Sequence, residues 1–156
     1  MRYESPESLD AAVALMAEAG DGGRVLAGGT DLLVQLRAGT VAPDVIVDIK
    51  KIAEMCEITE EDGGFRVGAA VTGAELGEHA AFSAAWPGVV EGTELIGSSQ
   101  IQSRATMGGN LCNSSPAADS VPAQIAADAV LRIAGPDGVR ELPVAEFCTG
   151  VGTNAL

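Results

Sequence analysis

Apolar residues in the first fifty positions alternate between a helical and a strand-like pattern. Apolar residues every three or four positions predict a helix over residues 6–19, with Pro6 at its first position, Ser5 as its cap and Gly20 ending it. The run "RVLAGG" that follows predicts a short buried strand. The next ten residues, "TDLLVQLRAG", predict a second helix whose leucines face inward and whose end is set by its last glycine.

The strand predicted in "DVIVDI" completes this first unit. Its run of apolar β-branched residues is typical of a parallel strand that is covered on both faces of a sheet. Up to about Ile52 the pattern therefore predicts a small α/β unit.

After Ile52 the pattern changes to hairpins and short helices. Turn residues at 62–64 and 136–138 each predict a hairpin between two short strands. Thr72 and Glu75 form a capping-box pair, which predicts the start of a short helix.

Two more helices are predicted in this second part. One follows Trp86, which we expect to anchor the core, and another opens at Pro116 with Ser115 as its cap. The fold class is therefore α+β. We expect a small α/β subdomain over residues 1–54 and a larger α+β subdomain over residues 55–156.

Composition limits the function classes that remain. The 156 residues are enough for one ordinary domain, and 47% hydrophobic residues are enough for a real core. A formal net charge of −13 argues against nucleic acid or an anionic membrane surface as a partner. No apolar run reaches the length of a membrane span, and "MRYESPESLD" lacks the apolar segment of a signal peptide. We expect a cytoplasmic protein.

Residues able to bind metals or to act as acids and bases are few. Cys56, Cys112 and Cys148 are far apart and form no C-x-x-C pair, which argues against a zinc or iron–sulfur site and favours reduced thiols. His79 is the only histidine and is expected to be a solvated helix residue. Arg104 could neutralise a phosphate or form a salt bridge. We assign no catalytic residue and no metal ligand.

Gly28 and Gly29 stand where the first predicted strand gives way to a helix. Glycines there allow a positive φ and a close approach of the backbone to a ligand. The N–H groups of Thr30, Asp31 and Leu32 would then suit a phosphate or pyrophosphate. The G-x-G-x-x-G fingerprint is absent, so a simple tight turn is the alternative.

A second glycine loop is predicted at Gly108, Gly109 and Asn110, preceded by the hydroxyl of Thr106. Asn110 can donate and accept hydrogen bonds. Asp119 is suited to accept hydrogen bonds from sugar or ribityl hydroxyls, or it is an ordinary carboxylate in the first turn of a helix. Two such loops together favour a nucleotide-type cofactor.

Several segments in order along the whole chain carry a family resemblance. The most specific is "RATMGGNLCNSSPAADS", and "VLAGGTDLLVQLRAG", "VIVDIKKI", "RVGAAVTGAEL" and "EFCTGVG" accompany it. The chain resembles the FAD-binding medium subunit of aerobic molybdenum hydroxylases, the carbon monoxide dehydrogenase and xanthine dehydrogenase type of enzyme. The resemblance implies the flavin-binding fold also found in vanillyl-alcohol oxidase and in UDP-N-acetylenolpyruvoylglucosamine reductase.

The resemblance also implies which residues contact FAD. A first FAD loop wraps the pyrophosphate with backbone amides, a second FAD loop follows later in the chain, an apolar residue lies beside the cofactor and an acid contacts its hydroxyls. Carried over by position, the implied FAD-binding residues are Val25, Leu26, Ala27, Gly28, Gly29, Thr30, Asp31, Leu32, Ile96, Thr106, Met107, Gly108, Gly109, Asn110 and Asp119.

The sequence departs from the family at its end. It stops at "GVGTNAL", where family members continue through further strands and a C-terminal domain. We therefore expect a chain truncated at the C-terminus, without the lysine that contacts FAD in the missing part. Thr153 and Asn154 also stand where a basic residue is usual.

In this family the flavin subunit is an electron relay. The resemblance implies that electrons pass from [2Fe–2S] clusters in a small iron–sulfur subunit through FAD to an external acceptor, while the molybdenum cofactor lies in a large subunit. Two alternatives remain open: a stand-alone flavin-dependent reductase or oxidase on the same fold, and a non-enzymatic interaction domain whose glycine loops are only turns.

Overall fold

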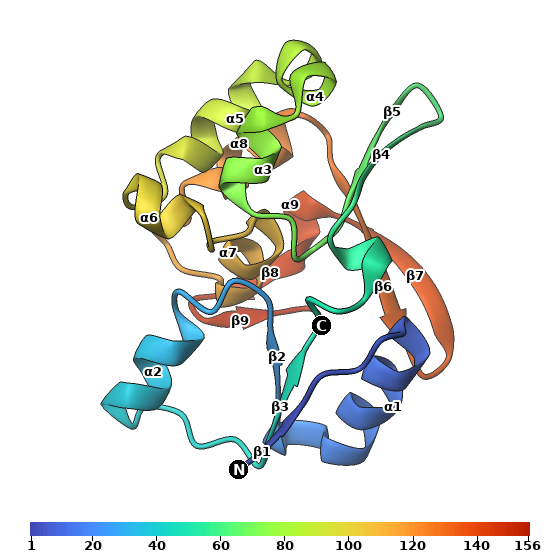
Figure 1. Cartoon of the computed structure of the whole chain (residues 1–156), viewed down its shortest axis with the longest axis vertical. Coiled ribbons are helices and arrows are strands. Elements are labelled where there is room, and N and C mark those ends of the chain that lie inside the picture. The colour runs from blue at the N-terminus through green and yellow to red at the C-terminus, as the bar shows by residue number, and fades with distance from the viewer.

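Three parallel strands form the sheet around which the first part of the chain folds. In the computed structural model, which describes residues 1–156, β1 (Arg2–Glu4) and β2 (Gly23–Leu26) both pair with the central strand β3 (Val45–Asp48). β3 is buried along its whole length, and α1 (Leu9–Ala19) packs against the sheet (Figure 1). The predicted parallel, covered sheet is confirmed, whereas β1 was not predicted.

The first helix begins later than its sequence suggested. Ser8 is its cap, and the Ser8 hydroxyl accepts a hydrogen bond from the N–H of Ala11 at 3.3 Å. The prediction of Ser5 as the cap and Pro6 as the first helical residue was wrong, because a second serine three residues on takes the capping role. Gly20 ends the helix, as predicted.

The second helix, α2 (Leu32–Ala38), ends as predicted at Gly39, which has a left-handed φ of 71°. The expected inward direction of its leucines was wrong for Leu33, which is 51% exposed. None of the α2 residues is buried, because the helix makes few contacts with the rest of the chain. It lies at the lower left in Figure 1.

Both predicted hairpins are present in the second part of the chain. β4 (Ile58–Glu61) pairs antiparallel with β5 (Gly64–Val67), and β6 (Val130–Gly135) pairs antiparallel with β7 (Gly138–Pro143). Each turn lies where its turn residues predicted it.

Short helices make up most of the upper half of the molecule (Figure 1). The capping box of Thr72 and Glu75 is formed at the first of them, as predicted. The remaining elements are α3 (Gly73–Glu78), α4 (Ala80–Ala85), α5 (Pro87–Glu94), α6 (Ser99–Gln102), α7 (Met107–Asn113), α8 (Ser120–Ala126), α9 (Val144–Phe147), β8 (Cys148–Gly150), β9 (Thr153–Asn154) and the 3₁₀ turns η1 (Gly20–Gly22) and η2 (Ala53–Met55).

Two expectations about these helices were wrong. α8 begins at Ser120 and not at Pro116, because the Ser115 hydroxyl accepts from the N–H of Ala117 and closes a separate turn. Trp86 is 37% exposed, so it is not a core anchor. Its place in the core is taken by Phe82, which stacks edge-to-face on Phe65 with ring centroids 5.3 Å apart.

The core consists of three apolar clusters. The first surrounds β3 and includes Ile52 and Ala70, the second lies among α3, α4 and α5, and the third joins Leu111 to Val144 and Phe147. Ala70 belongs to the cluster around the first sheet, so the two parts share apolar contacts. The division at residues 54 and 55 stays a prediction. None of the helices combines the length and the apolar character needed to cross a membrane.

Candidate functional site

The two glycine segments lie directly against one another. A Cβ atom at Gly28 would collide with the carbonyl oxygen of Arg104 and would lie 3.1 Å from the Cα of Ala105. Only glycine allows this approach of the two backbones. The segment after β2 and the segment before α7 therefore form one structural unit, although about 80 residues separate them in sequence.

The first glycine segment leaves a run of backbone donors free. Gly29 has a φ of 79° and reverses the chain between β2 and α2. The N–H groups of the four residues Gly28–Asp31 make no hydrogen bond within the chain. Backbone N–H groups are rarely left without an acceptor unless water or a ligand provides one, so this run is suited to an anionic group.

The second segment differs from the predicted loop, because Gly108, Gly109 and Asn110 lie in the first turn of α7. Thr106 caps this helix, and its hydroxyl accepts from the N–H of Gly109 at 2.9 Å. The N–H of Gly108 makes no hydrogen bond within the chain, whereas the antiparallel bridge between Thr72 and Thr106 directs the Met107 N–H to the Val71 carbonyl. The segment thus contributes one free donor, the Gly108 N–H, next to the four of the first loop.

A cleft of about 260 Å³ lies between the two segments. It brings together five residues that the sequence singled out, and it adds five that were not predicted. Its lining is Thr30, Asp31, Ile96, Gly97, Ile101, Asn110, Asn113, Ser115, Ala117 and Asp119. Of the added residues, Asn113 had a signal, because it follows Asn110 by three positions on the same helix.

The polar groups of the cleft differ in what they still offer to a ligand. Asp119 is exposed, and its carboxylate makes no hydrogen bond, so it is free to accept. The Asn110 carbonyl oxygen already accepts from the hydroxyl of Ser120 at 2.7 Å, which leaves the amide donors of Asn110. Thr106 is only 2% exposed and uses its hydroxyl for the cap, so its side chain does not line the cleft.

The remaining predicted residues lie beside the cleft and not in its lining. Val25 and Leu26 belong to β2, where Leu26 is buried. Ala27 follows the strand, and Leu32 is the first residue of α2. These four can position the loop through their backbone.

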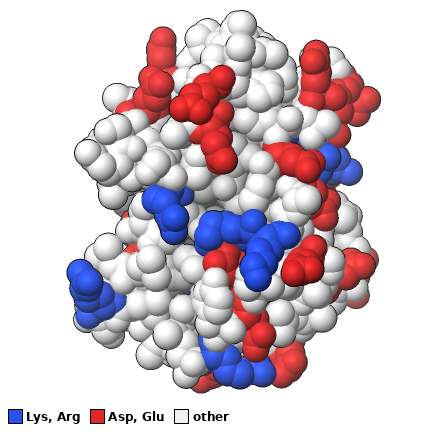
Figure 2. Space-filling model, viewed as in Figure 1, with Lys and Arg blue, Asp and Glu red and all other residues white.

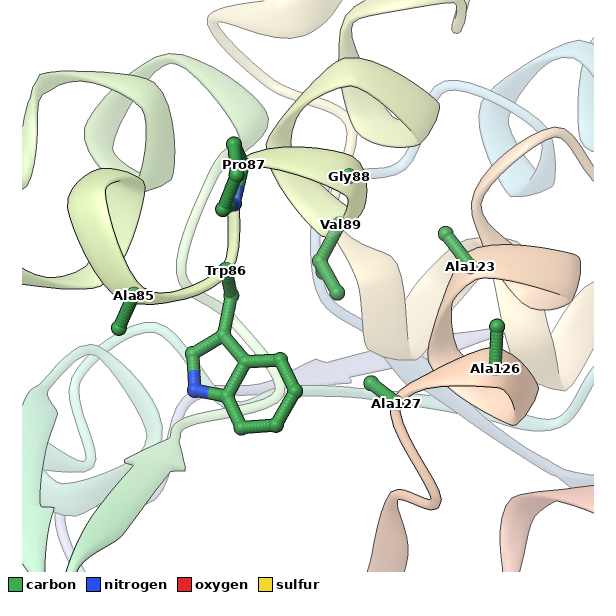
Figure 3. A pocket seen from close by; sticks show the side chains of 8 residues that line it. All are labelled: Ala85, Trp86, Pro87, Gly88, Val89, Ala123, Ala126 and Ala127. Carbon is green, nitrogen blue, oxygen red and sulfur yellow. The ribbon is translucent and has the colours of Figure 1, made fainter.

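A second hollow of about 330 Å³ has a different character (Figure 3). It contains none of the predicted residues. Trp86 lies across it, and small apolar side chains of α5 and α8 face it (Figure 3). Its lining offers no carboxylate, amide or hydroxyl for a nucleotide.

Positive charge is concentrated near the middle of one face in a chain that is otherwise strongly acidic. Figure 2 shows Lys and Arg side chains across the middle of this face, with most Asp and Glu side chains above and below. Arg104, whose backbone touches Gly28, is exposed and forms no salt bridge or side-chain hydrogen bond. Its guanidinium is available to an anion.

The histidine and the cysteines, which we did not expect to be catalytic, show no arrangement typical of a reactive site. The His79 Nδ1 accepts from the N–H of Phe82 at 3.1 Å and caps α4. All three cysteines are free thiols. Surrounding protein atoms, and the nearby Cys148, raise the pKa of Cys112 to about 11, so this thiol is protonated at neutral pH. No group of three or more His, Cys, Asp or Glu residues could hold a metal ion.

Comparison with known proteins defines the class. The whole chain, residues 1–156, matches the model of a family described as the FAD binding domain in molybdopterin dehydrogenase. The fold matches about half of one chain in a structure of carbon monoxide dehydrogenase from Hydrogenophaga pseudoflava, with a TM-score of 0.96, 31% identity and coverage of 100% of this chain and 54% of that one. The chain therefore belongs to the family of FAD-binding domains of molybdopterin dehydrogenases.

Curated relatives agree with this assignment. The xanthine dehydrogenase FAD-binding subunit of Escherichia coli O157:H7 is 38% identical over 155 residues, which is 99% of this chain and 53% of that protein. The carbon monoxide dehydrogenase medium chain of Hydrogenophaga pseudoflava is 32% identical over 148 residues, 95% of this chain and 52% of that protein. The chain thus spans about half the length of the curated relatives that it matches.

Proposed function

We propose that this chain binds FAD as the flavoprotein part of a molybdenum hydroxylase. In this proposal the complex relays electrons from [2Fe–2S] clusters in a small iron–sulfur subunit through FAD to an external acceptor, and a large subunit holds the molybdenum cofactor. FAD supplies the redox-active isoalloxazine ring, and the protein supplies binding and electrostatics. Free thiols support a cytoplasmic location.

The observation that carries the FAD site is the set of free backbone donors. Five N–H groups, from Gly28–Asp31 and from Gly108, lie on two segments whose backbones touch. Phosphate oxygens are strong acceptors, and such donors need no side-chain charge to bind them. The two segments would therefore hold the pyrophosphate.

Side chains around the cleft suit the rest of the cofactor. The free carboxylate of Asp119 would accept hydrogen bonds from cofactor hydroxyls, and Ile96 offers an apolar wall. Arg104 would balance part of the phosphate charge. The cleft contains no histidine, cysteine or lysine, and we assign no catalytic acid or base in it, in keeping with a relay role.

The relatives support the assignment to a complex. Those named above are subunits of xanthine and carbon monoxide dehydrogenases, by their names. A stand-alone flavin-dependent reductase or oxidase on this fold is the second candidate. A change in the flavin spectrum on adding a reduced nicotinamide to the purified full-length subunit alone would favour this alternative.

We expect FAD to be held noncovalently in the full-length subunit. The one histidine caps α4, and the Cys112 thiol is protonated at neutral pH, so neither is a ready nucleophile toward the flavin. Acid precipitation should leave the yellow flavin in the supernatant. Flavin that stays with the precipitated protein would contradict this prediction.

Replacement of Asp119 by alanine should weaken FAD binding by about 10- to 100-fold, because one charge-assisted hydrogen bond contributes about 1.5–3 kcal/mol. The secondary structure should not change, since the carboxylate makes no hydrogen bond or salt bridge within the chain. Quenching of FAD fluorescence during titration of the apoprotein measures the affinity. Asp21→Ala, at another exposed aspartate whose carboxylate makes no hydrogen bond, is the matched control. Equal affinities of the two variants would remove Asp119 from the site.

A further inference from the structure

Lys50 connects the end of the central strand to the first glycine segment. Its ammonium donates to the Asp48 carboxylate oxygen Oδ1 at 2.7 Å and to the carbonyl oxygen of Ala27 at 2.9 Å. Asp48 is the last residue of β3, and Ala27 is the first residue after β2. Lys50 thus bridges two neighbouring parallel strands at their carboxyl ends, where the free N–H groups begin.

The carboxylate that holds Lys50 is itself fixed. The Asp48 side chain is 9% exposed, and its second oxygen accepts from the hydroxyl of Tyr3 on β1 at 2.5 Å. Burial alone would raise the pKa of Asp48, but hydrogen bonds from Lys50 and Tyr3 outweigh it and hold this pKa below its ordinary range. The carboxylate is ionised at neutral pH, so the lysine has a charged partner whose position the sheet determines.

The hydrogen bond from Lys50 to the Ala27 carbonyl affects the Gly28 N–H, which is one of the free donors of the candidate site. The carbonyl of Ala27 and the N–H of Gly28 belong to one peptide group, and the chain contains no cis peptide bond. In a trans peptide these two groups point in opposite directions. An ammonium on the carbonyl therefore fixes the direction of the Gly28 N–H on the other side. It also polarises the peptide, which strengthens that N–H as a donor.

We propose that Lys50 is a positioning residue for the cofactor: held by Asp48, it orients and polarises the Ala27–Gly28 peptide so that the Gly28 N–H binds the pyrophosphate. The inference rests on the proposed FAD site. It assigns a role to a residue that does not line the cleft. The role requires the ammonium, and the aliphatic stem of the side chain is not enough.

The test compares Lys50→Met, Lys50→Arg and Lys51→Met in the full-length subunit. Lys51 is the matched control, because it is the adjacent lysine, is exposed and makes no hydrogen bond or salt bridge. The probes are FAD and riboflavin, which has the same ring and ribityl chain but no phosphate. Fluorescence titration gives the affinity for each, and thermal unfolding without flavin reports stability.

Lys50→Met should weaken FAD binding by about 10- to 100-fold and leave riboflavin binding unchanged. Lys50→Arg should restore most of the FAD affinity, and Lys51→Met should behave as the wild type. Lys50→Met leaves a buried carboxylate without its partner and can fail to fold. The double variant Asp48→Asn/Lys50→Met removes both charges and should show the same selective loss of FAD affinity.

Two results would overturn this inference. One is wild-type FAD affinity in Lys50→Met or in the double variant, and the other is an equal loss of affinity for FAD and riboflavin, which indicates a purely structural role. A wild-type subunit that binds no FAD would overturn the proposed function as well. If the wild-type subunit binds FAD and only the Lys50 inference fails, the proposed function still stands.

Discussion

Gly28→Ala should abolish measurable FAD binding and lower the stability of the chain. The new methyl group would collide with the carbonyl of Arg104, so the two segments must move apart. Overpacking of this kind costs about 1–3 kcal/mol of unfolding free energy. The displacement also moves the free N–H groups of the first loop away from the Gly108 N–H, and loss of two charge-assisted hydrogen bonds lowers affinity by ~100-fold or more.

The measurement is FAD fluorescence titration together with thermal unfolding. Gly88→Ala is the matched control, because Gly88 lies in α5 and a Cβ there would meet no atom within 4 Å. Alanine in a helix should leave the stability of the control unchanged or slightly raised. Full flavin occupancy in Gly28→Ala would mean that the contact of the two segments does not form the binding site.

The full-length flavin subunit by itself should oxidise no substrate. The described chain has no group of three or more His, Cys, Asp or Glu residues able to hold a metal ion, and the cleft contains no histidine, cysteine or lysine. In the proposed relay, electrons reach the flavin from a cluster in another chain. The purified subunit should contain neither iron nor molybdenum by metal analysis, and the reduced iron–sulfur subunit should bleach its flavin absorbance.

The control for this experiment is the same mixture with an oxidised iron–sulfur subunit, which should leave the flavin absorbance unchanged. Substrate turnover by the flavin subunit alone would favour the stand-alone enzyme. Bleaching should also depend on bound flavin, so the Gly28→Ala variant should show no change in absorbance at the flavin band.

Elements determined by neighbouring residues could be predicted from the sequence. The capping box at Thr72, the two hairpin turns and the run of apolar β-branched residues in strand β3 each have their signal within a few residues. The strand β1 has no such signal, since it is three residues long and exists because it pairs with β3. Ser5 and Ser8 are chemically equivalent caps, and only the packed helix distinguishes them.

Only part of the candidate site could be predicted, because only part of it depends on residues that are neighbours in the sequence. Composition and loops pointed to Thr30, Asn110 and Asp119, which the cleft brings together. Sequence does not show which N–H groups remain without an acceptor, because this depends on every other hydrogen bond of the fold. Nor does it show that Lys50 reaches Ala27, since that contact requires β2 and β3 to be adjacent.

The weak packing of α2 has a consequence for the energetics of cofactor binding. The helix buries no residue, and one side-chain hydrogen bond, from Gln35 to Asn113 at 3.2 Å, ties it to α7. Segments with so few buried contacts open locally at a low free-energy cost, and their amide hydrogens exchange quickly. A ligand that binds only the closed form adds its binding free energy to that cost. In the proposed FAD site, flavin binding would stabilise α2 against such local opening, and we expect slower hydrogen exchange in residues 28–38 when the cofactor is bound.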